Sequence, residues 1–193
     1  MPGIPSSTIP RPSSLTAGVV IAGAGPVGLT LAMDLARRGV RVVVVEPRAA
    51  GEPPSVKCNH VAARSMELFR RLGLAAEIRA AGLPDDFPHD VAFRTSFTGR
   101  EITRIPIPSP AGRRRGDSGP DTDWPTPEPP HRINQIYLEP ILFARARETA
   151  RVEILSRVAL ETVTQDADGV VATARDLETG AKVRLEGAYL VGC

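Results

Sequence analysis

The chain has 193 residues, of which 42% are hydrophobic and 24% are charged, and its formal net charge at pH 7 is +2. This length suits one domain with a real core and is short for a two-domain enzyme. The small net charge gives no support to a nucleic-acid or membrane partner, and no apolar run approaches the ~20 residues that span a bilayer. Two cysteines are too few for a disulfide framework, so a cytoplasmic location is expected.

The first 17 residues are rich in proline and serine and contain no apolar segment typical of a signal peptide. We therefore expect a disordered leader over residues 1–17 and a folded domain over residues 18–193.

The next segment, residues 18–46, has the clearest pattern in the chain. Residues 19–21 form a short apolar run, which predicts a buried strand, and a glycine-rich turn follows it. A helix is predicted from residue 26 to its end at Gly39, and a second buried strand closes on Glu46. Apolar residues recur along it at helical spacing, at Val27, Leu31 and Leu35. A strand, a helix and a strand in this order predict a parallel sheet.

The remaining elements are expected from periodicity and turn residues. The predicted elements are helices over 59–74 and 75–82, antiparallel strands over 90–97 and 100–107, an irregular proline-rich loop over 106–130, a helix over 137–150, and a strand over 152–155. The first of these helices is predicted from the helical periodicity through Val61, Ser65, Leu68 and Leu72. Pro140 is tolerable only near the first turn of its helix. A three-stranded meander over 159–187 and a separate buried strand over 188–193 complete the chain. The predicted fold class is α/β, Rossmann-like.

The glycine-rich turn matches the dinucleotide fingerprint Gly-x-Gly-x-x-Gly at Gly23, Gly25 and Gly28. Gly23 allows the tight turn out of the strand, Gly25 lets the backbone approach a pyrophosphate, and Gly28 lets the helix pack closely on the strand. The helix that begins at Pro26 and Val27 offers unpaired N–H groups and the positive end of its dipole to phosphates.

Glu46 is the acidic residue that the fingerprint requires at the end of the second strand. Its carboxylate can accept both hydroxyl groups of an adenosine ribose, and its charge disfavours the 2′-phosphate of NADP. The fingerprint by itself does not distinguish FAD from NAD. No Cys/His spacing suits a metal site, and no residue can be named as a catalytic acid or base.

Three further stretches extend the pattern: "KCNHVAARSMELFRRLGL", "INQIYLEPIL" and "GAYLVGC". Together with the fingerprint, they resemble the FAD-dependent aromatic hydroxylases, the single-component flavoprotein monooxygenases related to p-hydroxybenzoate and phenol hydroxylases. The resemblance covers residues 17–193 and corresponds to the N-terminal portion of that family. It implies a Rossmann-like FAD-binding domain truncated before the family's Asp-Gly motif, which would begin at residue 194. It also implies that residues 88–131 belong to a substrate-side sheet and loop.

The resemblance assigns further cofactor contacts. Lys57 falls where the family usually has an arginine near the flavin phosphates or ribityl chain, and Gln135 falls on a glutamine that contacts the cofactor. Arg48 is expected to flank the adenosine. The family uses FAD, with NAD(P)H as a transient co-substrate, to hydroxylate phenolic or polyketide-type rings. Two alternatives stay open: a non-catalytic dinucleotide-binding fragment that associates with itself through exposed apolar surface, and an NAD-linked oxidoreductase.

Overall fold

The computed structural model of the chain describes residues 12–54, 56–123 and 125–193. They form two compact units. Unit 1 comprises the described residues of Met1–Glu52 and Ala146–Cys193, and unit 2 those of Pro53–Arg145. No helix among these residues is long and apolar enough to cross a bilayer.

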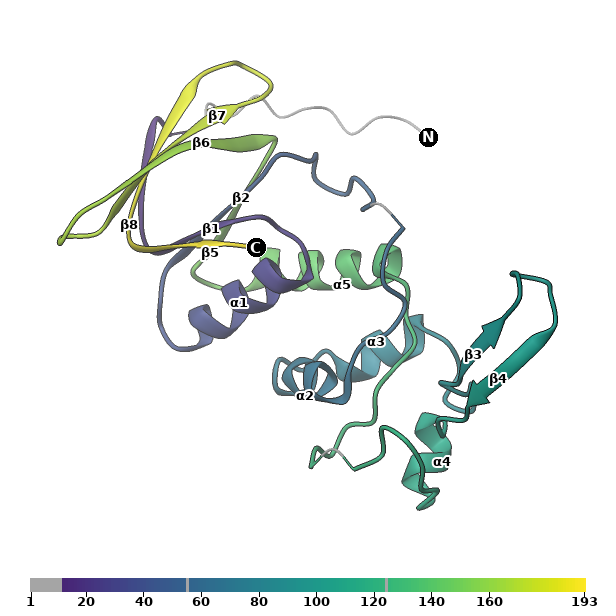
Figure 1. The fold of residues 1–193 in the computed structure, drawn as a ribbon. Coiled ribbons are helices and arrows are strands. Elements are labelled where there is room, and N and C mark those ends of the chain that lie inside the picture. Colours follow the sequence, from purple (N-terminus) through teal and green to yellow (C-terminus); the bar gives the residue numbers. More distant parts are fainter. Residues whose placement is uncertain (1–11, 55, 124) are drawn as a thin grey trace, which may run out of the picture. The chain divides into compact units, whose positions relative to one another are not determined.

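Unit 1 is built on a six-stranded mixed sheet with the order β5-β2-β1-β8-β7-β6 (Figure 1). Its elements in chain order are β1 (Ser14–Ala22), α1 (Pro26–Arg37), β2 (Val42–Glu46), β5 (Val152–Ser156), β6 (Val158–Gln165), β7 (Val170–Asp176) and β8 (Lys182–Gly192). Strands β5, β2, β1 and β8 pair in parallel, and β8, β7 and β6 pair antiparallel. The expected βαβ start, parallel sheet and meander are confirmed.

Strand β1 begins earlier than the sequence indicated. Its first residue, Ser14, lies inside the stretch that we assigned to a leader, and Ser14 pairs with Arg184 of β8. Residues 1–11 lie outside the described residues. The strand starts early because β8 is long enough to give Ser14 a partner.

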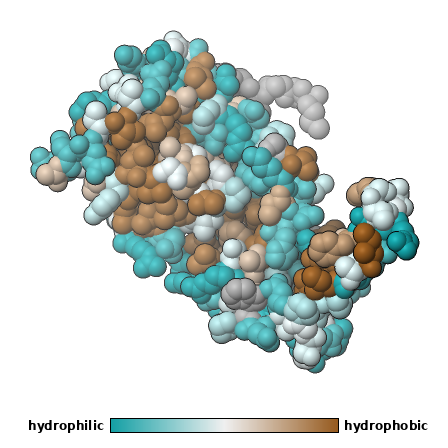
Figure 2. Space-filling model, viewed as in Figure 1, coloured by the Kyte–Doolittle hydropathy of each residue, from teal (hydrophilic) through white to brown (hydrophobic). Residues whose placement is uncertain are grey.

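The last strand differs from the expectation of two separate strands. Residues 182–192 form the single strand β8, whose first half pairs with β7 and whose length from Arg184 to Gly192 pairs with β1. Of its final residues, Leu190 and Val191 are only partly buried, whereas Tyr189 and the thiol-bearing Cys193 are exposed. Figure 2 shows a continuous apolar area over the part of unit 1 where β1 and β8 lie. Self-association through such a surface stays a prediction.

The buried face of helix α1 does not consist of the apolar residues Val27, Leu31 and Leu35 that mark its periodicity. Its buried residues are Gly28, Leu29, Ala32, Met33 and Ala36. Val27 is 68% exposed, and Leu31 and Leu35 are only partly buried. The helix is apolar on most sides, so its spacing alone does not decide which side meets the sheet. Its end is as predicted, because Gly39 has a φ of +85° and its N–H donates to the carbonyl oxygen of Ala36.

Unit 2 contains most of the remaining elements. They are α2 (Ala63–Arg71), α3 (Ala75–Ala81), β3 (Val91–Arg94), β4 (Glu101–Ile105), α4 (Pro110–Arg114) and α5 (Gln135–Glu148), of which α5 ends in unit 1. The expected antiparallel pair is confirmed as β3 and β4. Helix α2 buries Ala63, Met66 and Phe69. Three of the residues that marked its periodicity, Ser65, Leu68 and Leu72, are only partly buried.

Two proline-containing segments of unit 2 correct the sequence interpretation. The segment expected as a loop contains α4, because the Ser109 hydroxyl accepts from Gly112 N–H at 3.0 Å and Pro110 stands in the first turn. Helix α5 begins at Gln135, two residues earlier than expected, so Pro140 lies inside the helix and not in its first turn.

Candidate dinucleotide-binding site

The turn after β1 has the backbone conformation that its glycines allow. Gly23 has a φ of +114°, which L side chains rarely adopt. A Cβ on Gly23 would lie 2.3 Å from the carbonyl oxygen of Cys193, whose N–H donates to Ala22. Gly23 therefore serves both the turn and the close approach of the chain that leaves β8.

Helix α1 begins directly after this turn, at Pro26. A Cβ on Gly28 would lie 2.0 Å from the carbonyl oxygen of Gly23, so only glycine allows this contact. Gly25 is the N-cap residue, with no side chain capping the helix, and Pro26 occupies the first turn. The first turn contains no acidic residue, and Val27 beside it is exposed. The uncapped N-terminus therefore suits an anion such as a pyrophosphate.

Glu46 ends β2 with its carboxylate against the same turn. The residue is 7% exposed, and its Oε2 accepts from Ala24 N–H at 2.8 Å. Its Oε1 accepts from the N–H and the Nε–H of Arg48, each at 3.0 Å. Burial raises the pKa of Glu46, but the hydrogen bonds from Arg48 and Ala24 outweigh it and hold this pKa below its usual value. The carboxylate is therefore charged at neutral pH.

The fingerprint residues Gly23, Gly25, Pro26, Val27 and Gly28 thus gather with Glu46 and Arg48 at one edge of the unit 1 sheet. The carboxyl ends of parallel strands β1, β2 and β8 meet there. This is the edge where open α/β sheets bind their ligands. Its geometry fits FAD: glycine positions without room for a Cβ, an uncapped helix N-terminus, and a buried carboxylate beside the turn.

The two other candidate residues lie in unit 2. Lys57 is exposed, and the residue after it, Cys58, accepts a hydrogen bond from the backbone N–H of Gln135 at 3.1 Å. The Gln135 side chain donates to Glu139 Oε1 at 2.7 Å. Unit 2 therefore brings the loop of Lys57 and the start of α5 together.

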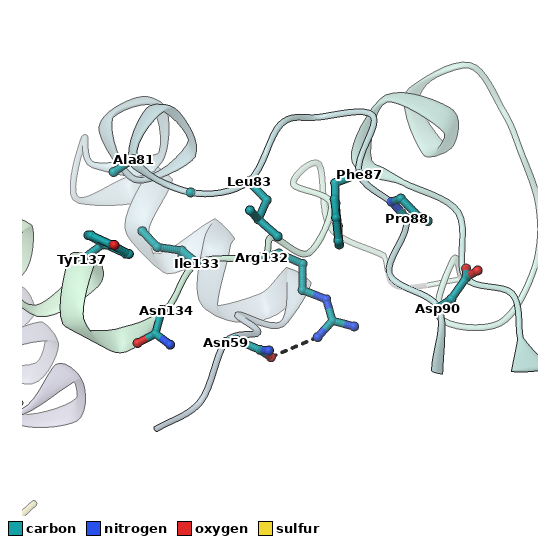
Figure 3. Close-up of a pocket in the computed structure, with 11 residues that line it drawn as sticks. Asn59, Ala81, Leu83, Phe87, Pro88, Asp90, Arg132, Ile133, Asn134 and Tyr137 are labelled. Atoms are coloured by element: carbon teal, nitrogen blue, oxygen red, sulfur yellow. Dashed lines mark hydrogen bonds between the residues drawn. The ribbon is translucent and has the colours of Figure 1, made fainter. Parts of the chain in front are cut away.

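Sequence reasoning missed two features. The first is the pairing of Arg48 with Glu46, for which the signal was an acid and a base two residues apart at a strand end. The second is a cavity of about 590 Å³ within unit 2. Its lining includes Leu83, Phe87 and Ile133 as apolar walls, and one guanidinium, Arg132. Figure 3 shows the Arg132 side chain reaching toward Asn59, to which it donates at 3.1 Å.

The fold and the site together define a Rossmann-like dinucleotide-binding protein. The family model for the FAD binding domain matches residues 16–193. The chain therefore belongs to the FAD-binding domain family of flavoprotein aromatic monooxygenases.

Individual relatives agree with this assignment. The chain is 32% identical over 175 residues to 2,4-dichlorophenol 6-monooxygenase of Cupriavidus pinatubonensis, covering 90% of this chain and 28% of the relative. It is 36% identical over 183 residues to aklavinone 12-hydroxylase of Streptomyces peucetius, covering 90% of this chain and 34% of the relative. The chain thus spans about a third of the length of these relatives.

Among solved structures, the rebeccamycin biosynthetic enzyme RebC with reduced flavin matches with a TM-score of 0.73 and 38% identity. The match covers 94% of this chain and 33% of RebC. The flavin-dependent monooxygenase PieE in complex with FAD and substrate matches with a TM-score of 0.76 and 27% identity, over 91% of this chain and 30% of PieE. These matches span both units of the chain and support FAD over NAD as the dinucleotide.

Proposed function

We propose that the chain is the FAD-binding portion of an NAD(P)H-dependent flavoprotein monooxygenase that hydroxylates a phenolic or polyketide-type ring. The names of its relatives support this class of substrate, since they include a dichlorophenol monooxygenase and an aklavinone hydroxylase. When bound, FAD supplies the redox and oxygen-transfer chemistry, and the protein's share is to bind, orient and shield it.

The residues of this chain have distinct roles in the proposal. Gly23, Gly25 and Gly28 admit the pyrophosphate to the turn, and the start of α1 at Pro26 and Val27 directs its N-terminal dipole at it. Glu46 accepts the ribose hydroxyls of the adenosine, which Arg48 borders. In unit 2, Lys57 and Gln135 bind the phosphates and the ribityl chain of the flavin.

The observation that carries the proposal is the hydrogen bond from Ala24 N–H to Glu46 Oε2 at 2.8 Å. It fixes a charged carboxylate next to the phosphate-binding turn, the position from which the fingerprint's acidic residue binds the ribose of a dinucleotide. The same charge disfavours a 2′-phosphate, so the site suits FAD and excludes NADP as its resident dinucleotide.

We place the aromatic substrate with unit 2, in line with the expectation that residues 88–131 belong to a substrate side. The cavity beside Phe87 has apolar walls for a ring and the Arg132 guanidinium for a phenolate oxygen. Replacing Arg132 by methionine then weakens the binding of 2,4-dichlorophenolate measured by calorimetry. The same variant leaves FAD affinity unchanged.

The test of the cofactor is the purified protein itself. A yellow protein that releases FAD on denaturation, and that binds added FAD more tightly than NAD, is the expected result. A colourless protein that prefers NAD in the same titration would show that the flavoprotein assignment is wrong.

Turnover is tested by NADPH oxidation with and without a panel of phenols. We expect no hydroxylated product from this chain, because the relatives named above are about three times as long. Hydroxylation by the chain alone would overturn that expectation and the non-catalytic alternative together.

A further inference from the structure

The Glu46 carboxylate has no acceptor position left for a ribose. A carboxylate offers about four lone-pair sites. Two of them accept backbone N–H groups, from Ala24 at 2.8 Å and from Arg48 at 3.0 Å. The other two accept the Arg48 side chain, through Nε–H at 3.0 Å and through an Nη2–H at 3.3 Å. An adenosine ribose that needs two of these sites must displace something.

The side-chain bonds are the ones that can yield. The backbone bonds belong to the turn and to the end of β2, so they orient the carboxylate whether or not a ligand is present. The Arg48 side chain is 30% exposed, against 10% for Glu46. Because Arg48 is the more exposed partner, its side chain can leave the carboxylate without breaking the backbone bonds from Ala24 and Arg48.

We propose that Arg48 is a positioning residue which holds Glu46 in the free chain and which the adenosine ribose displaces when the dinucleotide binds. This inference rests on the proposed function, because it assumes an adenosine at this edge. Two consequences follow. Arg48 stabilises the free chain, and it weakens binding, since only molecules with the guanidinium released are competent.

The size of the effect follows from the exposure of the pair. A partly exposed bidentate pair contributes on the order of 1 kcal/mol, which corresponds to about a fivefold change in affinity. The bonds are charge-assisted, which places the pair at the upper end of surface pairs.

The experiment compares Arg48→Met with Arg41→Met in the full chain. Arg41 precedes the other end of β2, where its exposed side chain pairs with Glu153 at 3.8 Å, so both variants lose one positive charge. The probes are ADP, which has both ribose hydroxyls, and 2′,3′-dideoxy-ADP, which has neither. Calorimetry gives the affinities, and thermal unfolding is recorded with and without ADP.

We expect Arg48→Met to bind ADP about fivefold more tightly than the wild type and to show no such gain for dideoxy-ADP. Its melting temperature falls without ligand, and the rise on adding ADP is larger than in the wild type. We expect Arg41→Met to change the affinities for ADP and dideoxy-ADP only slightly and by equal factors, because it removes one distant charge.

An unchanged or weaker affinity of Arg48→Met for ADP overturns the inference but leaves the proposed function standing, provided that the wild type binds FAD. Equal gains for ADP and dideoxy-ADP overturn it as well, because the ribose hydroxyls then play no part. Failure of every variant to bind FAD and ADP overturns the inference and the proposed function together.

Discussion

Gly28 lies directly on Gly23: a Cβ added to Gly28 would stand 2.0 Å from the Gly23 carbonyl oxygen. The requirement for glycine at the last position of the fingerprint is thus partly a requirement of the protein itself, before any ligand binds. The start of α1 can approach the end of β1 this closely only because Gly28 lacks a side chain.

Gly28→Ala should therefore destabilise unit 1 by about 1–3 kcal/mol, the range typical of overpacking a tight contact. The opposing atom is backbone and cannot move aside like a flexible side chain. Denaturant unfolding measures the loss. Gly192→Ala is the matched control, because a Cβ there meets nothing within 4 Å; equal stability of the two variants would contradict the role given to Gly28.

Val27→Asp is expected to move stability and FAD affinity in opposite directions. Val27 is 68% exposed in the first turn of α1, where no acidic residue stands. A carboxylate there interacts favourably with the helix dipole, by about 0.3–1 kcal/mol, but repels a pyrophosphate. The melting temperature should rise slightly while FAD binding by fluorescence quenching is lost. Val27→Asn, without the charge, keeps most of the binding.

Glu46 makes the stability of unit 1 depend on pH in the acidic range. Its pKa in the folded chain lies below its ordinary value, so the folded state holds the charged form better than the unfolded state does. The stabilisation is complete above pH 4.5 and is lost as the pH falls through the folded-state pKa. Unfolding curves at a series of pH values below 5 should show a smaller loss for Glu46→Gln than for the wild type. Parallel curves would mean that other carboxylates dominate.

His89 gives unit 2 a pH dependence at a higher pH. Burial, with the nearby charge of Arg132, lowers the pKa of His89 to about 4, and its Nδ1 is buried without a partner among the described residues. The folded state therefore resists protonation. Stability is complete above pH 6.5 and falls by up to about 3 kcal/mol as the pH drops from 6.5 to 4.

Replacing the imidazole tests this dependence. In His89→Phe, hydrogen exchange of unit 2 amides should lose most of its pH dependence between pH 6.5 and 4, after correction for intrinsic rates. His60 packs edge-on against His89 with ring centroids 5.5 Å apart and is only half-buried. His60→Phe should leave most of this pH dependence in place. If His60→Phe removes more of it than His89→Phe does, His89 is not its source.

A mostly buried ion pair holds the proline-rich segment of unit 2 near its end, at Glu128. Arg79 of α3 donates to Glu128 at 2.8 Å and to the carbonyl oxygen of Pro129 at 2.7 Å, and both side chains of the pair are mostly buried. Arg79→Met leaves Glu128 without this partner. We therefore expect the free energy of unfolding to fall by about 1–3 kcal/mol and proteolysis within residues 106–130 to be faster.

The matched control for Arg79 is Arg64→Met. Arg64 pairs with Glu67 one turn along α2, with its side chain 63% exposed, and such pairs contribute well under 1 kcal/mol. Equal protease sensitivity of the two variants would show that the Arg79 pair does not fasten the segment.

Much of the fold could be predicted from interactions between residues that are close in the sequence. The turns of the meander follow from side chains that bond their own backbone: Asp166 Oδ1 accepts from Asp168 and Gly169, and the next turn places Gly180 at a φ of +74°. The fingerprint and Glu46 could also be predicted from the sequence, because the spacing of the glycines and the acidic residue is set by one short βαβ segment.

What the sequence determined by itself was the βαβ start, the antiparallel pair β3 and β4, the dinucleotide-type turn and the carboxylate at its edge, all of them set within short stretches of chain. Only the tertiary structure decided which side of α1 meets the sheet, that β8 pairs with both β1 and β7, and that Arg48 closes over Glu46. Helix α1 is apolar on several sides, so its burial depends on where the sheet lies. The length of β8 depends on a partner some 170 residues away, Ser14 opposite Arg184. Such choices rest on contacts between distant segments, and periodicity along the chain carries no information about them.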